Sequence, residues 1–160
     1  MPSASQCYLE WFPYQKDRTM GLNHQMASLS CALGEAFRTQ RTLLLPPSIC
    51  LFALHTERWA AKGASPGETC IPITELFDVD ALSRLVPVQV VSSSRELVAQ
   101  HEGATAVDVG AGWNSARIAK EYPCSGAGAA FLVRRSVGTF WFQQCARRLT
   151  DYNTLAAALN

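Results

Sequence analysis

The sequence has no pair of cysteines at the close spacing that structural zinc sites use. Its cysteines are scattered, and no two of them are separated by only two residues, so we expect no metal site. Their number is even, which allows disulfides if the protein matures in a secretory compartment. The other interpretation is that several are small buried hydrophobic residues. They are Cys7, Cys31, Cys50, Cys70, Cys124 and Cys145, and their spacing defines no pairing.

Long apolar runs and an excess of one charge are also missing. No run reaches the ~20 apolar residues that a membrane-spanning helix needs. The formal net charge is +1, with no basic stripe and no signature of a nucleic-acid-binding module. We therefore expect neither a membrane segment nor a nucleic-acid partner in this chain.

The sequence also shows no room for a targeting segment. The residues that precede the first apolar segment, Met1 to Ser5, are too few for a signal sequence. The protein is therefore either cytosolic, or its chain begins downstream of its targeting segment, and the localisation stays open. With 160 residues, of which 48% are hydrophobic and 17% charged, the chain is long enough for one domain with a core and short for two. We expect a single domain over residues 1–160.

A strand, a helix and a second strand are predicted in the first part of the chain. Residues 6–12 are aromatic and apolar and end at a proline, which predicts a short buried strand. From Leu22 to about Thr39 apolar residues recur at helical spacing, and Asn23 is placed to cap this helix. Residues 42–46 form an apolar run typical of a parallel strand covered on both faces. The predicted apolar face of the helix consists of Met26, Leu29, Leu33 and Phe37.

This strand–helix–strand pattern predicts that residues 6–12 and 42–46 lie adjacent and parallel, with a right-handed crossover. Further along the chain we expect a loop over 60–69, a short helix before a strand at 86–91, a helix at 95–101, a strand or turn at 107–109 and apolar segments at 129–133 and 140–142. The predicted fold is therefore α/β, a three-layer Rossmann-like domain around a mostly parallel sheet.

The loop between the first strand and the first helix carries residues suited to binding a ligand. Gly21 would let a ligand approach the backbone closely, and the helix start that follows offers free N–H groups to anions. Asn23, His24 and Gln25 follow in sequence, and the two amides provide directional hydrogen bonds without burying a charge. This chemistry suits a diphosphate or sugar hydroxyls. The simpler interpretation is that Asn23 is only a helix cap and that His24 lies on the surface.

Two blocks of the sequence resemble the O-fucosyltransferase family, particularly its plant and algal members. The first block joins a Gly-Leu-Asn-His-Gln loop and an alanine-rich helix, residues 21–33, to Arg-Thr-Leu-Leu-Leu-Pro at 41–46. The second is Ile-Thr-Glu-Leu-Phe-Asp-Val-Asp-Ala-Leu at 73–82, which precedes the strand-like segment 87–91. Together they cover residues 6–91, whereas residues 92–160 resemble the family only loosely.

The resemblance implies the N-terminal half of a GT-B glycosyltransferase, which has two Rossmann-like domains and an active site between them. Such enzymes transfer fucose from GDP-fucose to a hydroxyl of a protein or glycan acceptor, without a bound metal or other cofactor. By position, Asn23 would face the diphosphate-sugar region of the donor, Gly21 would allow its close approach, and His24 and Gln25 would line the same cleft. The resemblance also implies localisation to the Golgi or the endoplasmic reticulum.

Two departures from the family pattern leave this chain without an assigned catalytic residue. In one branch of the family an acidic residue, proposed as the base, stands where this chain has Met20. The His-x-Arg motif that opens the donor-binding half is absent, because His24, His55 and His101 are not followed by arginine two residues later. We therefore expect a domain that cannot complete sugar transfer alone and becomes an enzyme only with its donor half. The sequence does not distinguish a fragment, a partial gene model and a degenerate paralogue as the origin of this chain. The alternative is a non-catalytic binding domain that kept the fold and lost the donor half.

A second glycine-containing loop has a different resemblance. Val-Asp-Val-Gly-Ala-Gly at 107–112 is similar to the first motif of S-adenosylmethionine-dependent methyltransferases, but some fifty residues follow it, too few for the rest of that fold. The competing interpretation is a peripheral loop and helix. The pairs at 134–135 and 147–148, all arginine, are either a phosphate-contact surface or solvated ends of helices and strands.

Overall fold

The computed structural model describes residues 7–11, 22–51, 69–92, 94–100, 105–109, 115–124 and 130–134. The strands are β1 (Tyr8–Trp11), β2 (Thr42–Leu45), β3 (Ser48–Leu51), β4 (Thr69–Pro72), β5 (Val88–Val90), β6 (Thr105–Asp108) and β7 (Ala130–Arg134). The helices are α1 (Leu22–Thr39), α3 (Ile73–Leu76), α4 (Val79–Ser83), α5 (Ser94–Gln100) and α6 (Ser115–Glu121). None of the helices in these ranges is both long and apolar enough to span a bilayer.

Five strands form one sheet in the order β5-β2-β1-β7-β6, and every neighbouring pair in it is parallel. The predicted pairing of the first two strands is confirmed, because Leu9 of β1 lies opposite Leu43 of β2 in parallel register. The predicted strand at 86–91 is β5 at the edge, and the apolar segment at 129–133 corresponds to β7, inserted between β1 and β6. The apolar segment at 140–142 lies outside the described residues.

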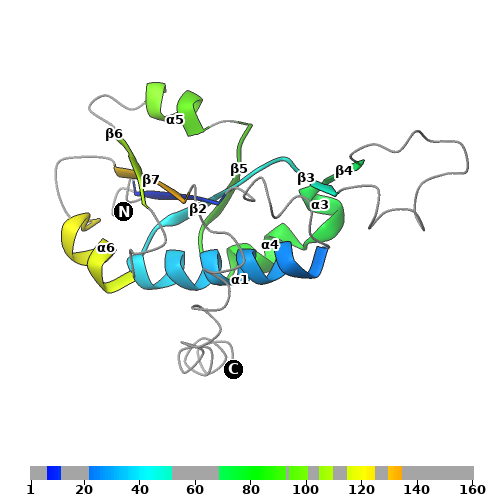
Figure 1. Ribbon diagram of the computed structural model, residues 1–160, viewed down its shortest axis with the longest axis horizontal. Helices are drawn as coiled ribbons and strands as arrows, with labels where there is room; N and C mark the ends of the chain where they lie inside the picture. Colours follow the sequence, from blue (N-terminus) through cyan, green and yellow to red (C-terminus); the bar gives the residue numbers. More distant parts are fainter. Residues whose placement is uncertain are drawn as a thin grey trace, which may run out of the picture.

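Helices cover both faces of this sheet, as Figure 1 shows, with α5 on one side and α1, α4 and α6 on the other. The arrangement follows from right-handed crossovers. The chain moves in one direction from β1 through β2 to β5, returns through α5 to β6 at the far edge, and then moves in the first direction again to β7. A right-handed connection that crosses the sheet in the opposite direction places its helix on the opposite face. The described residues therefore form a mixed α/β fold with a Rossmann-like parallel sheet.

The core follows the alternation of side chains along the strands. In β1 and β2, the residues Leu9, Trp11, Leu43 and Leu45 are buried in the main core cluster together with Leu29 and Ala32 of α1. Leu44 points to the other face, where it packs with Tyr8 of β1 and with Leu97 and Val98 of α5. The strand at 42–46 is thus covered on both sides, as its continuous apolar sequence predicts.

The buried face of α1 differs from the predicted one. Leu29 is buried as expected, but Met26 and Phe37 are 41% and 42% exposed, so the prediction for these two residues is wrong. The face that meets the sheet is rotated by one residue and includes polar side chains, because tertiary hydrogen bonds satisfy them. The indole Nε1 of Trp11 donates to Ser28 Oγ at 3.0 Å. The buried residues of α1 are Gln25, Ser28, Leu29, Cys31, Ala32, Glu35, Ala36 and Thr39.

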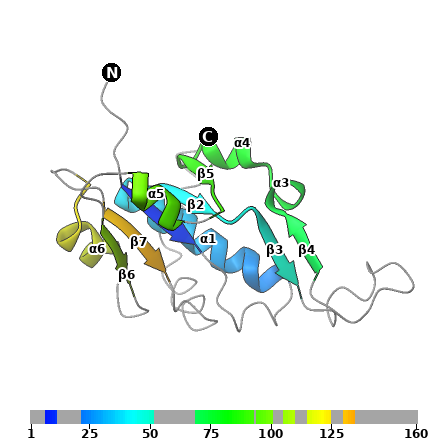
Figure 2. The ribbon, with the colours of Figure 1, turned by 90° about the horizontal axis from the view of Figure 1, so that it is seen from above.

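A two-stranded antiparallel ribbon, β3–β4, extends beside the main sheet and was not predicted (Figure 2). Cys50 and Cys70 lie directly opposite each other in it and form a disulfide. Cys31 is also disulfide-bonded, whereas Cys7 and Cys124 are free thiols. Both interpretations of the cysteines are therefore correct for some of them: Cys31, Cys50 and Cys70 form disulfides, whereas Cys7 is a buried free thiol. Of the predicted loop at 60–69, Thr69 begins β4 and the rest lies outside the described residues.

We expect Ser28→Ala to lower the free energy of unfolding by about 1–3 kcal/mol, because it leaves the buried indole N–H of Trp11 without its acceptor. Ser30→Ala is a matched control on the same helix, since the Ser30 hydroxyl donates within the helix, to the Met26 carbonyl oxygen one turn earlier. Urea unfolding of both variants measures the difference. Equal midpoints for the two variants would show that the Trp11–Ser28 hydrogen bond does not hold α1 on the sheet.

Candidate functional site

The carboxyl ends of the five parallel strands lie at one edge of the sheet, where ligands bind in open α/β folds. Helix α1 begins at this edge, because it follows β1 and runs back along the sheet (Figure 2). Strand β1 is central in the sheet, and α1 packs on β1 and β2, while its first turn contacts the β3–β4 ribbon through Gln25. No acidic residue occurs in this first turn, which leaves the positive end of the helix dipole uncompensated by a carboxylate on α1 itself.

Of the four residues predicted to bind a ligand, the structure describes the side chains of Asn23 and Gln25, and it places these two in different surroundings. Gly21 lies outside the described residues. Asn23 is the second residue of α1 rather than its cap, since the helix starts at Leu22, and its side chain is exposed. His24 follows it in the same turn. Gln25 is fully buried, and its Nε2 donates to the Cys50 carbonyl oxygen at 3.3 Å. Residues two apart on a helix point in different directions, so Asn23 faces solvent while Gln25 joins α1 to the β3–β4 ribbon.

Strand β7 brings a cationic residue to the same edge. Arg134 is the last residue of β7, and its register partner is Trp11, the last residue of β1. The sequence indicated the arginine pair at 134–135 as a possible phosphate contact, but only the strand order shows that it adjoins β1. A local pattern could not reveal this, since β1 and β7 stand at opposite ends of the chain.

The second glycine-containing motif lies at the periphery of the sheet. Its strand is β6, the edge strand, and Asp108 ends that strand opposite Val133 of β7. Val109 is buried, and α6 begins at Ser115. The motif residues from Gly110 to Asn114 lie outside the described residues. A position on the edge strand agrees with the peripheral interpretation of this segment.

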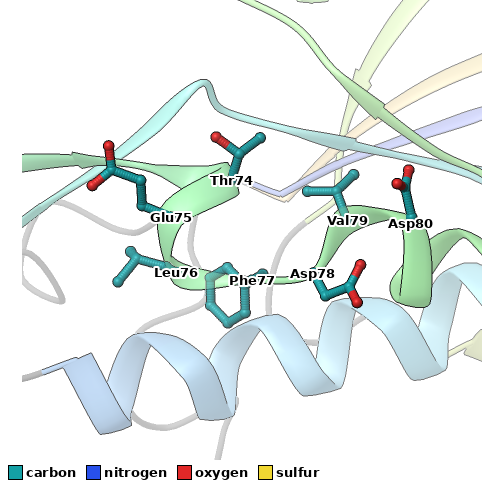
Figure 3. Close-up of a pocket in the computed structure, with 7 residues that line it drawn as sticks. All are labelled: Thr74, Glu75, Leu76, Phe77, Asp78, Val79 and Asp80. Carbon is teal, nitrogen blue, oxygen red and sulfur yellow. The ribbon is translucent and has the colours of Figure 1, made fainter.

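A shallow hollow of about 490 Å³ lies along the segment that joins α3 to α4, and it is lined by residues 74–80 (Figure 3). Three of its residues are acidic: Glu75, Asp78 and Asp80. Asp78 caps α4, because its Oδ1 accepts a hydrogen bond from the Ala81 backbone N–H at 2.9 Å. Phe77 points toward α1 and packs against the core. The carboxylates disfavour an anionic ligand here, so the hollow does not suit a diphosphate.

The arginine of the Arg-Thr-Leu block has a structural role. Arg41 is 1% exposed, and its guanidinium donates to the carbonyl oxygen of Tyr8 at 3.4 Å and to that of Tyr122. It therefore joins the start of β1 to the end of α6 at the amino edge of the sheet, away from Asn23. Carbonyl oxygens partly replace the water that a buried guanidinium loses. The described residues contain no group of three or more potential metal-ligating side chains.

Arg41→Lys should lower the free energy of unfolding by about 2–3 kcal/mol, because a lysine ammonium cannot reproduce the planar fork that reaches both carbonyls. Arg84→Lys, at an exposed residue directly after α4, serves as the control and should change stability by less than about 0.5 kcal/mol. Chemical denaturation measures both. A similar small effect for the two variants would contradict the structural role of Arg41.

Comparison with known proteins identifies no relative, since no protein-family model, no curated protein and no solved structure matches this chain.

Proposed function

We propose that this chain is a glycosyltransferase-like domain of the O-fucosyltransferase type, which supplies the acceptor-side half of a GT-B enzyme. The observation that carries the proposal is the β1–α1–β2 unit, in which parallel strands flank a helix that begins at the carboxyl edge with an exposed Asn23. The O-fucosyltransferase family has this order of elements in the two blocks that the sequence resembles. The donor would be GDP-fucose and the acceptor a hydroxyl of a protein or glycan.

The first turn of α1 has the electrostatic character that a diphosphate needs. The first backbone N–H groups of a helix have no acceptor within the helix, and the helix dipole favours an anion there. This turn contains no carboxylate that would oppose one. The Asn23 amide is exposed at this turn. Arg134 ends the neighbouring strand β7 at the same edge, which adds a cationic residue to that side of the sheet. The acidic hollow at 74–80 is less suited to the donor than the first turn of α1, because its carboxylates would repel a diphosphate.

The exposed disulfide supports a secretory location. Cys70 is exposed and Cys50 partly exposed in the β3–β4 ribbon, and disulfides at such positions persist mainly in oxidising compartments. Location in the endoplasmic reticulum or the Golgi is therefore part of the proposal, in agreement with the resemblance.

Catalysis would require residues that this chain does not contain. Met20 stands where one branch of the family has an acid, and no His-x-Arg occurs in the sequence. The arginine of that motif stabilises negative charge on the leaving diphosphate, so we propose that transfer depends on a donor-binding half.

The isolated chain should therefore show no transfer from GDP-fucose. A radiolabelled donor, mixed with protein and glycan acceptors, provides the measurement, and a reaction without protein is the blank. Label incorporated above that blank would contradict the assignment of the charge-stabilising arginine to a separate half.

In the chain joined to its donor-binding half, Asn23→Ala should weaken binding of GDP-fucose roughly 10- to 100-fold, the equivalent of losing a hydrogen bond of about 1.5–3 kcal/mol to a charged group. Its effect on stability should stay below about 1 kcal/mol, since Asn23 is exposed and lies one residue inside the helix start. Calorimetric titration and thermal melting of the same samples separate the two quantities. Gln100→Ala, which removes an exposed amide at the end of α5, is the control.

A lower melting temperature with unchanged affinity would mean that Asn23 only stabilises the helix. Gly21→Trp should block the same approach of the donor, because the resemblance places Gly21 where the donor comes close to the backbone. If both variants, joined to the donor-binding half, bind GDP-fucose like the unmodified protein, the proposed contact of this edge with the donor fails.

The second candidate is a binding domain without catalysis, favoured by Met20 and by the absence of His-x-Arg. The reading frame downstream of codon 160 distinguishes the two. A frame that encodes a His-x-Arg half supports the enzyme, whereas an immediate stop supports the binding domain.

A further inference from the structure

Two free thiols from opposite ends of the chain meet at the amino edge of the sheet. Cys7 immediately precedes β1 and is 3% exposed, and Cys124 follows α6 and is partly buried. Cys7 is close enough to Cys124 for its side chain to raise the pKa of the Cys124 thiol. The Cys124 thiol also donates to the Thr39 carbonyl oxygen at 3.4 Å. The Cys7 carbonyl oxygen accepts from the Thr42 N–H at 2.9 Å. Both cysteines are therefore held against the turn that joins α1 to β2.

Arg41, in the middle of that turn, fixes the two segments that carry the cysteines. Its guanidinium donates to the carbonyl of Tyr8, next to Cys7, and to that of Tyr122, two residues before Cys124. Its own backbone N–H donates to the Ala36 carbonyl oxygen at 2.9 Å, which anchors the turn to α1. The thiols are thus brought together by the fold itself, and a bond between them needs no long segment to be rearranged.

We propose that Cys7 and Cys124 are a disulfide-forming pair, oxidised by exchange with a small-molecule or protein disulfide. The Cys124 sulfur, as its thiolate, attacks one sulfur of that disulfide and releases the other as a thiol. Cys7 then loses its proton and attacks the Cys124 sulfur of the mixed disulfide, which releases the second thiol. The protein loses two hydrogens, and the oxidant gains them as two thiols. Cys124 reacts first, because it is the less buried of the two.

The surroundings of Cys124 make this a slow reaction rather than a catalytic one. Burial raises the pKa of the Cys124 thiol to about 12, and the Cys7 side chain adds to the increase, while the Arg41 guanidinium opposes it. The protonated thiol is a poor nucleophile. The pair therefore stays reduced on brief exposure and closes on sustained exposure to an oxidant, which is the behaviour of a structural bond.

The bond would join the start of β1 to the segment after α6 and enclose most of the described chain. A cross-link across so long a loop restricts the unfolded chain strongly. It would lie at the amino edge, opposite the edge where α1 begins. We therefore expect oxidation to raise thermal stability without changing the affinity of the carboxyl edge for GDP-fucose.

The test is to incubate the chain with oxidised glutathione, block the remaining thiols with iodoacetamide in denaturant and digest with trypsin without reduction. Trypsin releases the two cysteines on different peptides. Mass spectrometry should find these peptides linked, with two hydrogens fewer than their sum. The melting temperature should rise by roughly 5–10 °C. Neither change should occur in Cys7→Ala or in Cys124→Ala.

Alkylated Cys7 and Cys124 after the incubation would overturn the proposal, as would glutathione retained on Cys124 beside an alkylated Cys7, or either cysteine linked to a different one. A rise in melting temperature that persists in Cys124→Ala would also overturn it. The linked peptide is measured on the unmodified chain, so the result stands even if a variant fails to fold.

Discussion

The burial of α1 against β1 and β2 positions the other elements of the fold. Parallel neighbours cannot be joined by a short turn, so the chain needs a crossover, and this helix covers the strands it connects. Full burial of a leucine side chain contributes about 1.5–3 kcal/mol, and Leu9, Leu43, Leu45 and Leu29 are all almost fully buried at this contact. A backbone hydrogen bond contributes a net ~1 kcal/mol. Packing of the apolar face therefore stabilises this unit more than its hydrogen bonds do, and the ladder between β1 and β2 fixes its register.

The two edges of the sheet differ in character because of this arrangement. At the carboxyl edge, α1 begins with the exposed polar residue Asn23 in its first turn. At the amino edge, buried Arg41 and the two thiols join β1, α1 and the segment after α6. Rigidity at the amino edge would help to hold the proposed binding surface at the carboxyl edge in place, since both edges belong to the same strands.

The sequence predicted the elements whose signal is local. Continuous apolar residues defined β2, and helical spacing defined α1 to within one residue of its start. The orientation of α1 was not predictable in the same way. Ser28 and Gln25 are polar, so a sequence pattern places them on the exposed face, but hydrogen bonds to Trp11 and Cys50 allow their burial. The β3–β4 ribbon depends on the pairing of Cys50 with Cys70 across a long insertion. The position of Arg134 beside Trp11 depends on strand order. Each of these features is set by contacts distant in sequence, which no short window contains.

The order of strands also has a consequence for synthesis of the chain. β1 pairs with β2 on one side and with β7 on the other, and β7 is the last of the described strands to leave the ribosome. Until then β1 has an unpaired edge at the centre of the future sheet, and β6 is without the strand beside which it finally lies. Unpaired strand edges are templates for aggregation. The nascent protein therefore has an unpaired strand edge in the middle of its future sheet, and pairing with β7 closes it.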